Sequence, residues 1–384
     1  MKIITKLTFW SFLLCAISVF ASSPQATDFS QKSKPATVKV LLHRQASEAL
    51  LEAKGRYEIY YPLDGTKITS GINSNRHTIS ATEYGLKWGE EFKGLHQLRF
   101  VPVESTSSLL VNGIQYKGCI EVRSNDGKLN VINEVGVEQY LKSTLSSTFA
   151  EPIPQEAMNA IAIIARTNAY FIGSRNKQAD WHVIASDIGY KGASFLPKKH
   201  VDRAVETTDH LIMKYNDEPF AATWTQNSAG KTVNFAALHK DLKTPPGVTA
   251  PIAAKDRQQS KWTCAVPKTL LAQATDLPEI TGVDLYVSHQ AEKVYGVKVT
   301  GETLVKEFDF STFQRIVGAK KLRSNDFTVQ TKGDEIIFTG FGEGPGVGLC
   351  LYSAKAQAEK GEKAPQILQA FFPDTKLEKV NSLK

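Results

Sequence analysis

Short stretches of β-forming residues, separated by glycine, asparagine and aspartate, recur along most of this chain. They lie at residues 38–42, 57–61, 98–102, 120–122, 129–132, 284–287, 295–300 and 335–338. Alternating or clustered apolar residues between turn-forming residues are typical of strands. The chain is therefore expected to consist mainly of sheet, with few helices.

The clearest helical pattern begins at Pro154. Apolar residues repeat on one face at Met158, Ile161, Ala165 and Ile172. Glu156 suits a first helical turn, and Gly173 can close the C-terminus. The pattern predicts a central amphipathic helix over about 154–172, and further helical stretches are expected at 349–360 and 365–372. The predicted fold class is α+β with a β-rich body.

Composition supports a folded chain. The sequence has 384 residues, of which 42% are hydrophobic, and this is enough to form a core and to exclude wholesale disorder. Such a length suggests two domains or one elaborated domain.

The first 21 residues read as a signal peptide. Lys2 and Lys6 give a basic start, an apolar run follows to Phe20, and Val19-Phe20-Ala21 fits a signal-peptidase site. The alternative is an uncleaved membrane anchor, for which the run is short. Residues 22–36 are expected to form a flexible leader. The mature protein is predicted to be exported, periplasmic or associated with the cell wall, without a transmembrane segment.

Charge and site motifs exclude several classes of function. Loss of Lys2 and Lys6 lowers the formal charge from +7 to +5, which favours anionic surfaces, but the basic residues are scattered and predict no nucleic-acid binding. Metal-ligand spacing and dinucleotide fingerprints are missing, so neither a metal nor a cofactor is expected. Three cysteines remain after cleavage, Cys119, Cys264 and Cys350. They are expected to be small buried residues, although one pair could form a disulfide.

A glycine run occupies residues 340–348, between an expected strand and an expected helix. Gly342, Gly344, Gly346 and Gly348 recur at every second position. Alternate glycines allow a backbone to pass close to a ligand or to another chain segment, and free N–H groups at a helix start attract anions. The alternative is a tight turn packed against its own sheet.

Several segments, in the same order, resemble the SpoIID/LytB family, which comprises stage II sporulation protein D and amidase enhancers. The segments that carry the resemblance are Tyr116-Lys117-Gly118, Val131-Ile132-Asn133, Glu138 to Lys142, Glu156 to Thr167, Trp224 to Thr232, Leu322-Arg323-Ser324, Gly344 to Ala354, and Ile367 to Pro373. The resemblance implies one domain over residues 37–376, with a β-rich part at 37–125, a core part at 126–376 and a tail at 377–384.

The family resemblance implies a peptidoglycan substrate. Its catalytic members resemble lytic transglycosylases, in which one glutamic acid protonates the glycosidic oxygen of glycan strands stripped of stem peptides. Such an acid needs an apolar setting that raises its pKa. The sugar's own 6-hydroxyl then attacks, which makes a second catalytic carboxylate dispensable.

This sequence departs from the family at the catalytic position. The family's glutamate lies in S-E-M, where this chain has Ser147-Thr148-Phe149. Threonine has no acid group of suitable pKa, so Thr148 is expected to be inactive. Pro345 and Leu351 also replace a histidine and a glutamine of the family's glycine turn.

Two functions remain open. In the first, the protein binds glycan strands without cutting them and recruits or activates a wall hydrolase, such as an amidase. Its expected substrate-binding residues are Ser147, Asn227, Ser228, Gly230, Thr232, Gly344, Gly346 and Gly348, supported by Arg166 and Thr167. Arg166 could equally be a solvated or salt-bridged helix residue.

In the second, the protein is an active lytic transglycosylase whose general acid has moved. Glu151 follows Thr148 by three residues, and Glu343 lies within the glycine run. Each has a plainer alternative, because Glu151 could be a carboxylate near a helix N-terminus and Glu343 a solvated turn residue.

Overall fold

The computed structural model describes residues 36–193, 197–234, 243–288 and 292–380. The expected signal peptide (1–21) and all but the last residue of the expected leader (22–36) lie outside these residues. Within the described part, no helix is long and apolar enough to span a membrane.

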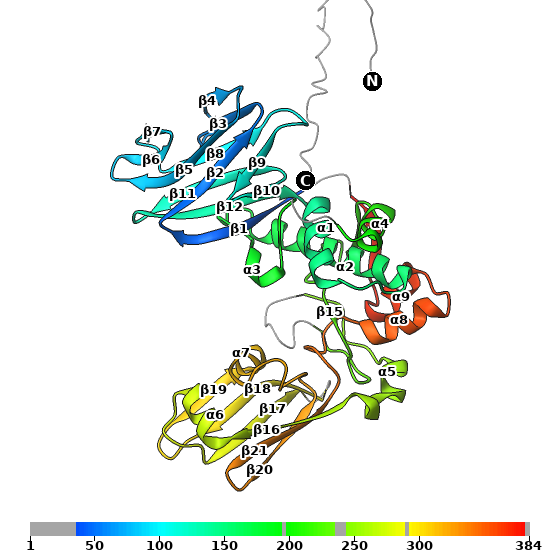
Figure 1. The fold of residues 1–384 in the computed structure, drawn as a ribbon. Helices are drawn as coiled ribbons and strands as arrows, with labels where there is room; N and C mark the ends of the chain where they lie inside the picture. Colours follow the sequence, from blue (N-terminus) through cyan, green and yellow to red (C-terminus); the bar gives the residue numbers. More distant parts are fainter. Residues whose placement is uncertain (1–35, 194–196, 235–242, 289–291, 381–384) are drawn as a thin grey trace, which may run out of the picture. The chain divides into compact units, whose positions relative to one another are not determined.

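The N-terminal part forms two largely antiparallel sheets (Figure 1). Their strands are β1 (Thr37–Ala46), β2 (Glu48–Lys54), β3 (Tyr57–Tyr60), β4 (Lys67–Gly71), β5 (Asn75–Thr82), β6 (Gly85–Trp88), β7 (Glu90–Lys93), β8 (Gln97–Pro102), β9 (Ser108–Val111), β10 (Ile114–Tyr116), β11 (Cys119–Asn125), β12 (Lys128–Gly136) and β13 (Val183–Ile184). The seven-stranded sheet has the order β13-β1-β12-β11-β8-β3-β4, and the six-stranded sheet has the order β10-β9-β2-β5-β6-β7.

Aromatic side chains join the two sheets. The Trp88 ring of β6 meets Tyr57 of β3 edge-on at a centroid distance of 5.6 Å and Phe100 of β8 at 5.1 Å. Its indole N–H donates to the Leu51 carbonyl at 2.9 Å, which satisfies the one polar atom of the buried ring. Because buried and less buried residues alternate along β2 and β3, each strand turns one face toward this core.

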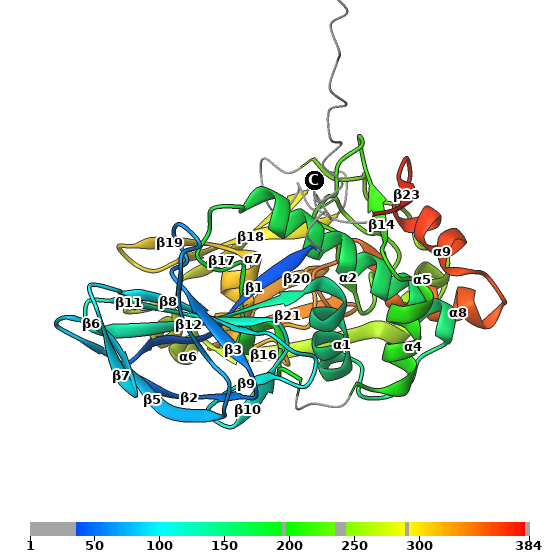
Figure 2. The ribbon, with the colours of Figure 1, turned by 90° about the horizontal axis from the view of Figure 1, so that it is seen from above.

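Helices and short strands follow the sheets. They are α1 (Val137–Thr148), α2 (Gln155–Arg175), α3 (Ala185–Ile188), α4 (Lys199–Thr207), β14 (Leu211–Lys214), β15 (Trp224–Thr225), α5 (Pro251–Lys255), β22 (Leu349–Cys350), α8 (Leu351–Glu359), α9 (Ala364–Phe371) and β23 (Lys376–Lys379). Helix α2 contacts α1, α4, α8 and α9, so helices from the middle of the chain and from its C-terminal part pack around it (Figure 2).

The central helix differs from the amphipathic one expected. It spans Gln155–Arg175, close to the predicted 154–172, but every residue from 157 to 164 is buried. Eight consecutive buried positions cover all sides of a helix with 3.6 residues per turn. Helix α2 is therefore a core helix enclosed by its neighbours, and the expected amphipathic pattern, with a single buried face, is not confirmed.

A second hydrophobic core lies in the C-terminal strands. Its elements are the 3₁₀ turn η2 (Arg257–Ser260), β16 (Lys261–Pro267), α6 (Lys268–Thr275), β17 (Gly282–Ser288), β18 (Lys293–Thr300), β19 (Val305–Asp309), α7 (Phe310–Val317), β20 (Phe327–Lys332) and β21 (Glu335–Phe341). They form two three-stranded antiparallel sheets, β16-β21-β20 and β17-β18-β19. Phe313 of α7 packs against Phe338 of β21 and Phe308 of β19.

The structure confirms a mixed α+β fold with a β-rich body, and each of the eight predicted stretches overlaps a strand. The expected division after residue 125 falls at the end of β11, which pairs with β12 in one sheet. The expected tail from residue 377 begins inside β23, which pairs with β14. Cys119, Cys264 and Cys350 are free thiols, and Cys264 is only partly buried.

Candidate functional site

The glycine run lies beside the segment that follows β15. β15 pairs in parallel with β22, and the backbones of Asn227 and Glu343 exchange two hydrogen bonds of 2.9 Å. Gly342 and Gly348 have φ of 79° and 73°. A Cβ at Gly342 would lie 2.4 Å from the Asn227 carbonyl oxygen, and one at Gly348 would lie 2.1 Å from that of Thr223. The glycines therefore allow a close approach to another segment of the same chain.

Backbone donors of the glycine run bind protein acceptors. The Gly344 N–H donates to the Arg323 carbonyl at 2.8 Å, and the Gly346 N–H donates to Thr225 Oγ1 at 3.2 Å. At the start of α8, the Tyr352 N–H donates to the Gln226 carbonyl at 3.0 Å. These groups hold the turn in place and are not available to an anion.

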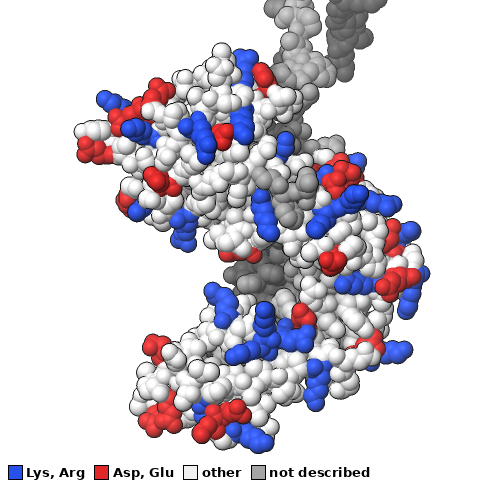
Figure 3. All heavy atoms as spheres, in the orientation of Figure 1, with Lys and Arg blue, Asp and Glu red and all other residues white. Residues whose placement is uncertain are grey.

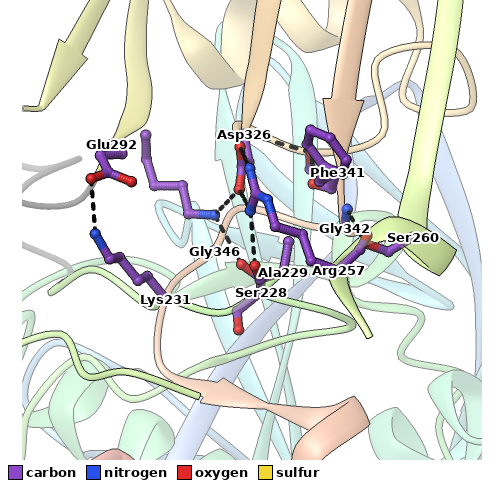
Figure 4. Close-up of polar contacts among 12 residues, drawn as sticks. Ser228, Ala229, Lys231, Arg257, Ser260, Glu292, Asp326, Phe341, Gly342 and Gly346 are labelled. Carbon is purple, nitrogen blue, oxygen red and sulfur yellow. Dashed lines mark hydrogen bonds and ion pairs between the residues drawn. The ribbon is translucent and has the colours of Figure 1, made fainter. Parts of the chain in front are cut away.

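A charged cluster of Lys293, Asp326 and Arg257 fastens the 228–229 backbone to the second core, and Figure 4 shows Asp326 and Arg257 above Ser228 and Ala229. The Lys293 ammonium donates to Asp326 Oδ2 at 2.7 Å and to the Ser228 carbonyl at 2.9 Å. Arg257 binds both oxygens of Asp326, at 2.6 and 2.9 Å, and the Ala229 carbonyl at 2.8 Å. Burial lowers the pKa of Lys293, and Asp326 opposes this shift.

A polar hollow of about 250 Å³ opens next to these contacts. We name it the Asn227–Glu343 hollow, and its lining residues are Asn227, Asp256, Gln259, Ser260, Arg323, Gly342, Glu343 and Tyr352. Arg323 Nη2 donates to Glu343 Oε2 at 2.7 Å, with both side chains about half exposed. The Tyr352 hydroxyl donates to Asp256 Oδ2 at 2.9 Å, and this hydrogen bond raises the pKa of Tyr352.

The hollow offers hydrogen-bonding groups of several kinds. Two carboxylates, two amides, a guanidinium, a phenol and a hydroxyl surround one space, and few of its residues are apolar. Such a lining suits a ligand rich in hydroxyl and amide groups better than an apolar one. On the face that Figure 3 shows, Lys and Arg side chains are spread over several parts of the chain instead of forming one stripe.

The structure brings two of the predicted site residues, Asn227 and Glu343, together in the hollow. Ser228, Gly230 and Thr232 are buried beside it. The Ser228 N–H donates to Cys350 Sγ at 3.3 Å, and its own hydroxyl has no partner among the described residues. The Thr232 hydroxyl accepts from the Val248 N–H at 3.0 Å, and the Gly230 carbonyl accepts from Ala250 at 2.8 Å.

The end of α1 carries the residues of the expected catalytic position. Thr148 is exposed, and its hydroxyl donates back to the Thr144 carbonyl at 3.0 Å. The Ser147 hydroxyl is buried without a partner among the described residues. Glu151 is exposed, and neither it nor Thr148 lines the Asn227–Glu343 hollow. The Phe149 ring lies 5.9 Å from that of Trp224, so the end of α1 contacts β15.

Arg166 and Thr167 are fully buried in the helical body. Arg166 binds both oxygens of Glu138 at 2.7 Å. Its other hydrogen bonds go to the Thr208 hydroxyl at 3.2 Å and to the carbonyls of Leu211 and Val205 at 3.1 and 3.2 Å. A guanidinium has five N–H donors, and all five are used here. Arg166 therefore has none to offer a ligand. The Thr167 hydroxyl accepts from Met213 N–H at 2.9 Å.

Three possible metal ligands lie close together beside Arg166. Glu138, Asp209 and His210 offer atoms within 4.8 Å of one another. Both Glu138 oxygens, however, already accept hydrogen bonds from Arg166, and His210 Nδ1 lies 2.7 Å from an oxygen of Asp209. This group fits an ion-paired network better than a metal site.

Sequence reasoning missed most of the hollow. Asp256, Gln259 and Ser260 stand in a segment with no recognisable motif. Arg323 and Tyr352 fall inside segments that carry the family resemblance, but nothing in the sequence gave them a role. Tyr352 and Asp256 are 96 positions apart, so only the fold brings them together.

Comparisons with known proteins find one family model that matches part of the chain and several proteins of similar sequence. The SpoIID model, described as stage II sporulation protein, matches residues 125–215. An uncharacterized protein of Chlamydia pneumoniae is 35% identical over 56% of this chain and 79% of its own length. Stage II sporulation protein D of Bacillus subtilis is 25% identical over 65% of this chain and 77% of its own. The amidase enhancer of the same species is 24% identical over 49% of this chain and 34% of its own.

Proposed function

The chain belongs to the SpoIID family, and from this premise we propose that it is an exported cell-wall protein that binds peptidoglycan glycan strands without cutting them. In this role it would assist or recruit a wall hydrolase. The observation that carries the proposal is Thr148, which stands where the family resemblance expects the catalytic glutamate.

Thr148 lacks the chemistry of a general acid. A lytic transglycosylase needs a carboxyl group that gives a proton to the glycosidic oxygen near neutral pH, and a hydroxyl cannot replace it. The Thr148 side chain is exposed and bonded to its own helix. Glu151, the nearest acid along the chain, is exposed and makes no ion pair or hydrogen bond among the described residues.

The Asn227–Glu343 hollow is the proposed binding site for the glycan. Its amide, phenol and guanidinium groups would bind sugar hydroxyl and acetamido groups. The glycine run holds Glu343 against Asn227, and the Lys293–Asp326–Arg257 cluster fixes the backbone just behind them. A site held by such contacts is pre-organised, so binding costs less conformational entropy.

The proposed partner is a wall hydrolase of the amidase class. The support is the name of one relative, the amidase enhancer, of which this chain matches 34%. A protein that holds glycan strands but lacks a general acid needs another enzyme to cut the wall.

A second candidate function, an active lytic transglycosylase, is favoured by one observation. Glu343 and Asp256 both line the hollow, so an acid would face a bound strand there. Glu343 would be the relocated acid, although its ion pair with Arg323 at 2.7 Å differs from the apolar setting that such an acid needs. Glu151 is the other residue able to act as the acid.

The test combines binding and cleavage on glycan strands stripped of stem peptides. We expect the protein to sediment with the strands and to produce no 1,6-anhydro ends by mass spectrometry. Asn227→Ala and Tyr352→Phe should each weaken sedimentation, because both remove a hydrogen-bonding group from the hollow. Failure of the wild-type protein to sediment with any strands would overturn the proposal.

Matched variants separate the two candidates. Glu343→Gln and Glu151→Gln make the same change of charge, inside and outside the hollow. Anhydro ends that disappear in either variant would establish the second candidate and identify its acid. Unchanged sedimentation of Asn227→Ala and Tyr352→Phe would move the binding site away from the hollow.

A further inference from the structure

The sheet β17-β18-β19 has one face that its core does not use. Strand pairing sets Leu285, Val297 and Phe308 in one row across the sheet, and these side chains join the second core. The neighbouring row consists of Asp284, Lys298 and Glu307. Successive side chains on a strand point to opposite faces, so this charged row lies on the outer face. Asp284 is 67% exposed, in agreement with that position.

Tyr286 lies across this outer face. It pairs with Gly296 on β18, and a Cβ added to Gly296 would lie 3.2 Å from Cδ2 of the Tyr286 ring. The Tyr286 hydroxyl reaches the third strand, where it donates to Glu307 Oε1 at 2.5 Å. The ring therefore spans all three strands, with one side on the Gly296 backbone. A larger residue at position 296 would lift it.

Tyr295 extends the surface that Tyr286 forms. Pairing shifts by one residue between Tyr286 and Val287, so Tyr295 is the extra residue of a β-bulge, and its side chain is 45% exposed. The two rings are 25° from parallel, with centroids 6.0 Å apart. Near-parallel rings at this spacing are displaced sideways, since directly superposed rings would be about 4 Å apart. We name this pair the Tyr286–Tyr295 platform.

The platform is not needed to complete the second core, whose rings are those of β16, α7, β19, β20 and β21. Tyr295 is exposed and Tyr286 is half-buried, and aromatic rings at a surface flanked by polar side chains indicate a binding surface. The charged side chains of this face are three carboxylates, Asp284, Glu307 and Asp309, and one ammonium, Lys298. With no basic excess, this surface suits an uncharged ligand and disfavours a polyanion.

We propose that the Tyr286–Tyr295 platform is a second saccharide-binding site, which takes an uncharged chain of amino sugars. The C–H faces of successive sugar rings stack on the two tyrosines. Asp284, Lys298 and Glu307 exchange hydrogen bonds with sugar hydroxyl and acetamido groups. The inference rests on the proposed function only for the amino-sugar unit. A glycan strand stripped of stem peptides also carries lactyl carboxylates, whereas the ligand proposed here is uncharged, and the residues of the platform are separate from those of the Asn227–Glu343 hollow.

The test is calorimetric titration of the full chain with chitohexaose, an uncharged amino-sugar oligomer. We expect binding that Tyr286→Ala and Tyr295→Ala each weaken about tenfold or more, as truncation of a central aromatic contact does. Binding should vary little with salt, because no charge pair is formed with the ligand. Tyr84→Ala is the matched control, since Tyr84 is an exposed tyrosine (59%) of the N-terminal sheets.

One further variant separates stacking from hydrogen bonding. Tyr286→Phe keeps the ring and removes its bond to Glu307, so it should retain most of the affinity. Absence of chitohexaose binding, or equal affinity of Tyr295→Ala and Tyr84→Ala, would overturn the inference. Neither result bears on sedimentation with stripped glycan strands, so the two proposals fail separately.

Discussion

Removal of Asp326 should destabilise the protein more than removal of its partner Lys293. Asp326 is 8% exposed and accepts three charge-assisted hydrogen bonds, one from Lys293 and two from Arg257. Asp326→Ala leaves the Lys293 ammonium, which is 3% exposed, with a single carbonyl partner. Breaking a buried ion pair from one side costs about 3–5 kcal/mol, because an uncompensated charge remains.

Lys293→Met should cost less, about 1–2 kcal/mol. Asp326 keeps both bonds to Arg257, and the loss is the bond from Lys293 to Asp326 and the bond to the Ser228 carbonyl. A charge-assisted hydrogen bond contributes about 1.5–3 kcal/mol, and the apolar methionine offsets part of this because it needs no desolvation. The two variants should therefore differ by about 2 kcal/mol.

Urea unfolding measures this difference. Trp262 reports on the region, since its indole N–H donates at 3.2 Å to Ser324, two residues before Asp326. Asp334→Ala is the control, because Asp334 lies exposed in the turn between β20 and β21 and should change stability by less than about 0.5 kcal/mol. The reasoning is refuted if Asp326→Ala matches that control, or if Lys293→Met is the more destabilising variant.

Three other predictions concern single positions. Burial raises the pKa of Glu134, but the Arg99 charge and a hydrogen bond from Thr37 outweigh it and lower the pKa below 4.5. The ionised Glu134 side chain therefore stabilises the folded protein above pH 4.5, and this contribution is lost as pH falls through the folded pKa. Glu134→Gln should flatten the acid side of a curve of unfolding free energy against pH. Gly348→Ala should lower thermal stability by about 2 kcal/mol or more, because φ is 73° and the new Cβ would overlap a carbonyl; an unchanged melting temperature would contradict the close approach. Asp309→Ala removes the N-cap of α7, which accepts from Thr312 N–H at 2.9 Å, and should cost about 1 kcal/mol in urea unfolding, whereas Asp309→Asn should retain most of it.

Local sequence patterns predicted helices, strands and turns well where neighbouring residues alone determine the local structure. Alternating apolar residues predicted strands such as β1, β8 and β21, since a strand with one buried face requires that period. The glycine run was correctly expected between a strand and a helix. Helix α2 was also located, but its enclosure on all sides depends on α8 and α9, which lie more than 170 residues further along the chain, as well as on α1 and α4, and no local pattern records this.

The candidate site was less predictable, because its polar residues come together through the fold. Arg166 was expected either to support a groove or to be a solvated or salt-bridged helix residue, and its five donors are used inside the helical body. Lys293 and Asp326 look like ordinary surface residues in the sequence, yet both are buried because each neutralises the other. Their pairing joins positions 33 residues apart, so no spacing rule identifies it.

The geometry of the Asn227–Glu343 hollow depends on backbone contacts and on charged residues that do not themselves line it. The glycines bring two backbones within hydrogen-bonding distance, and this fixes Asn227 against Glu343. Arg257 and Lys293 then hold the carbonyls of Ala229 and Ser228, so the same strand is tied to Asp326 in the second core. These contacts act on backbone atoms and on buried charges, so they hold the side chains of the hollow in place whichever residue stands at position 148 at the end of α1.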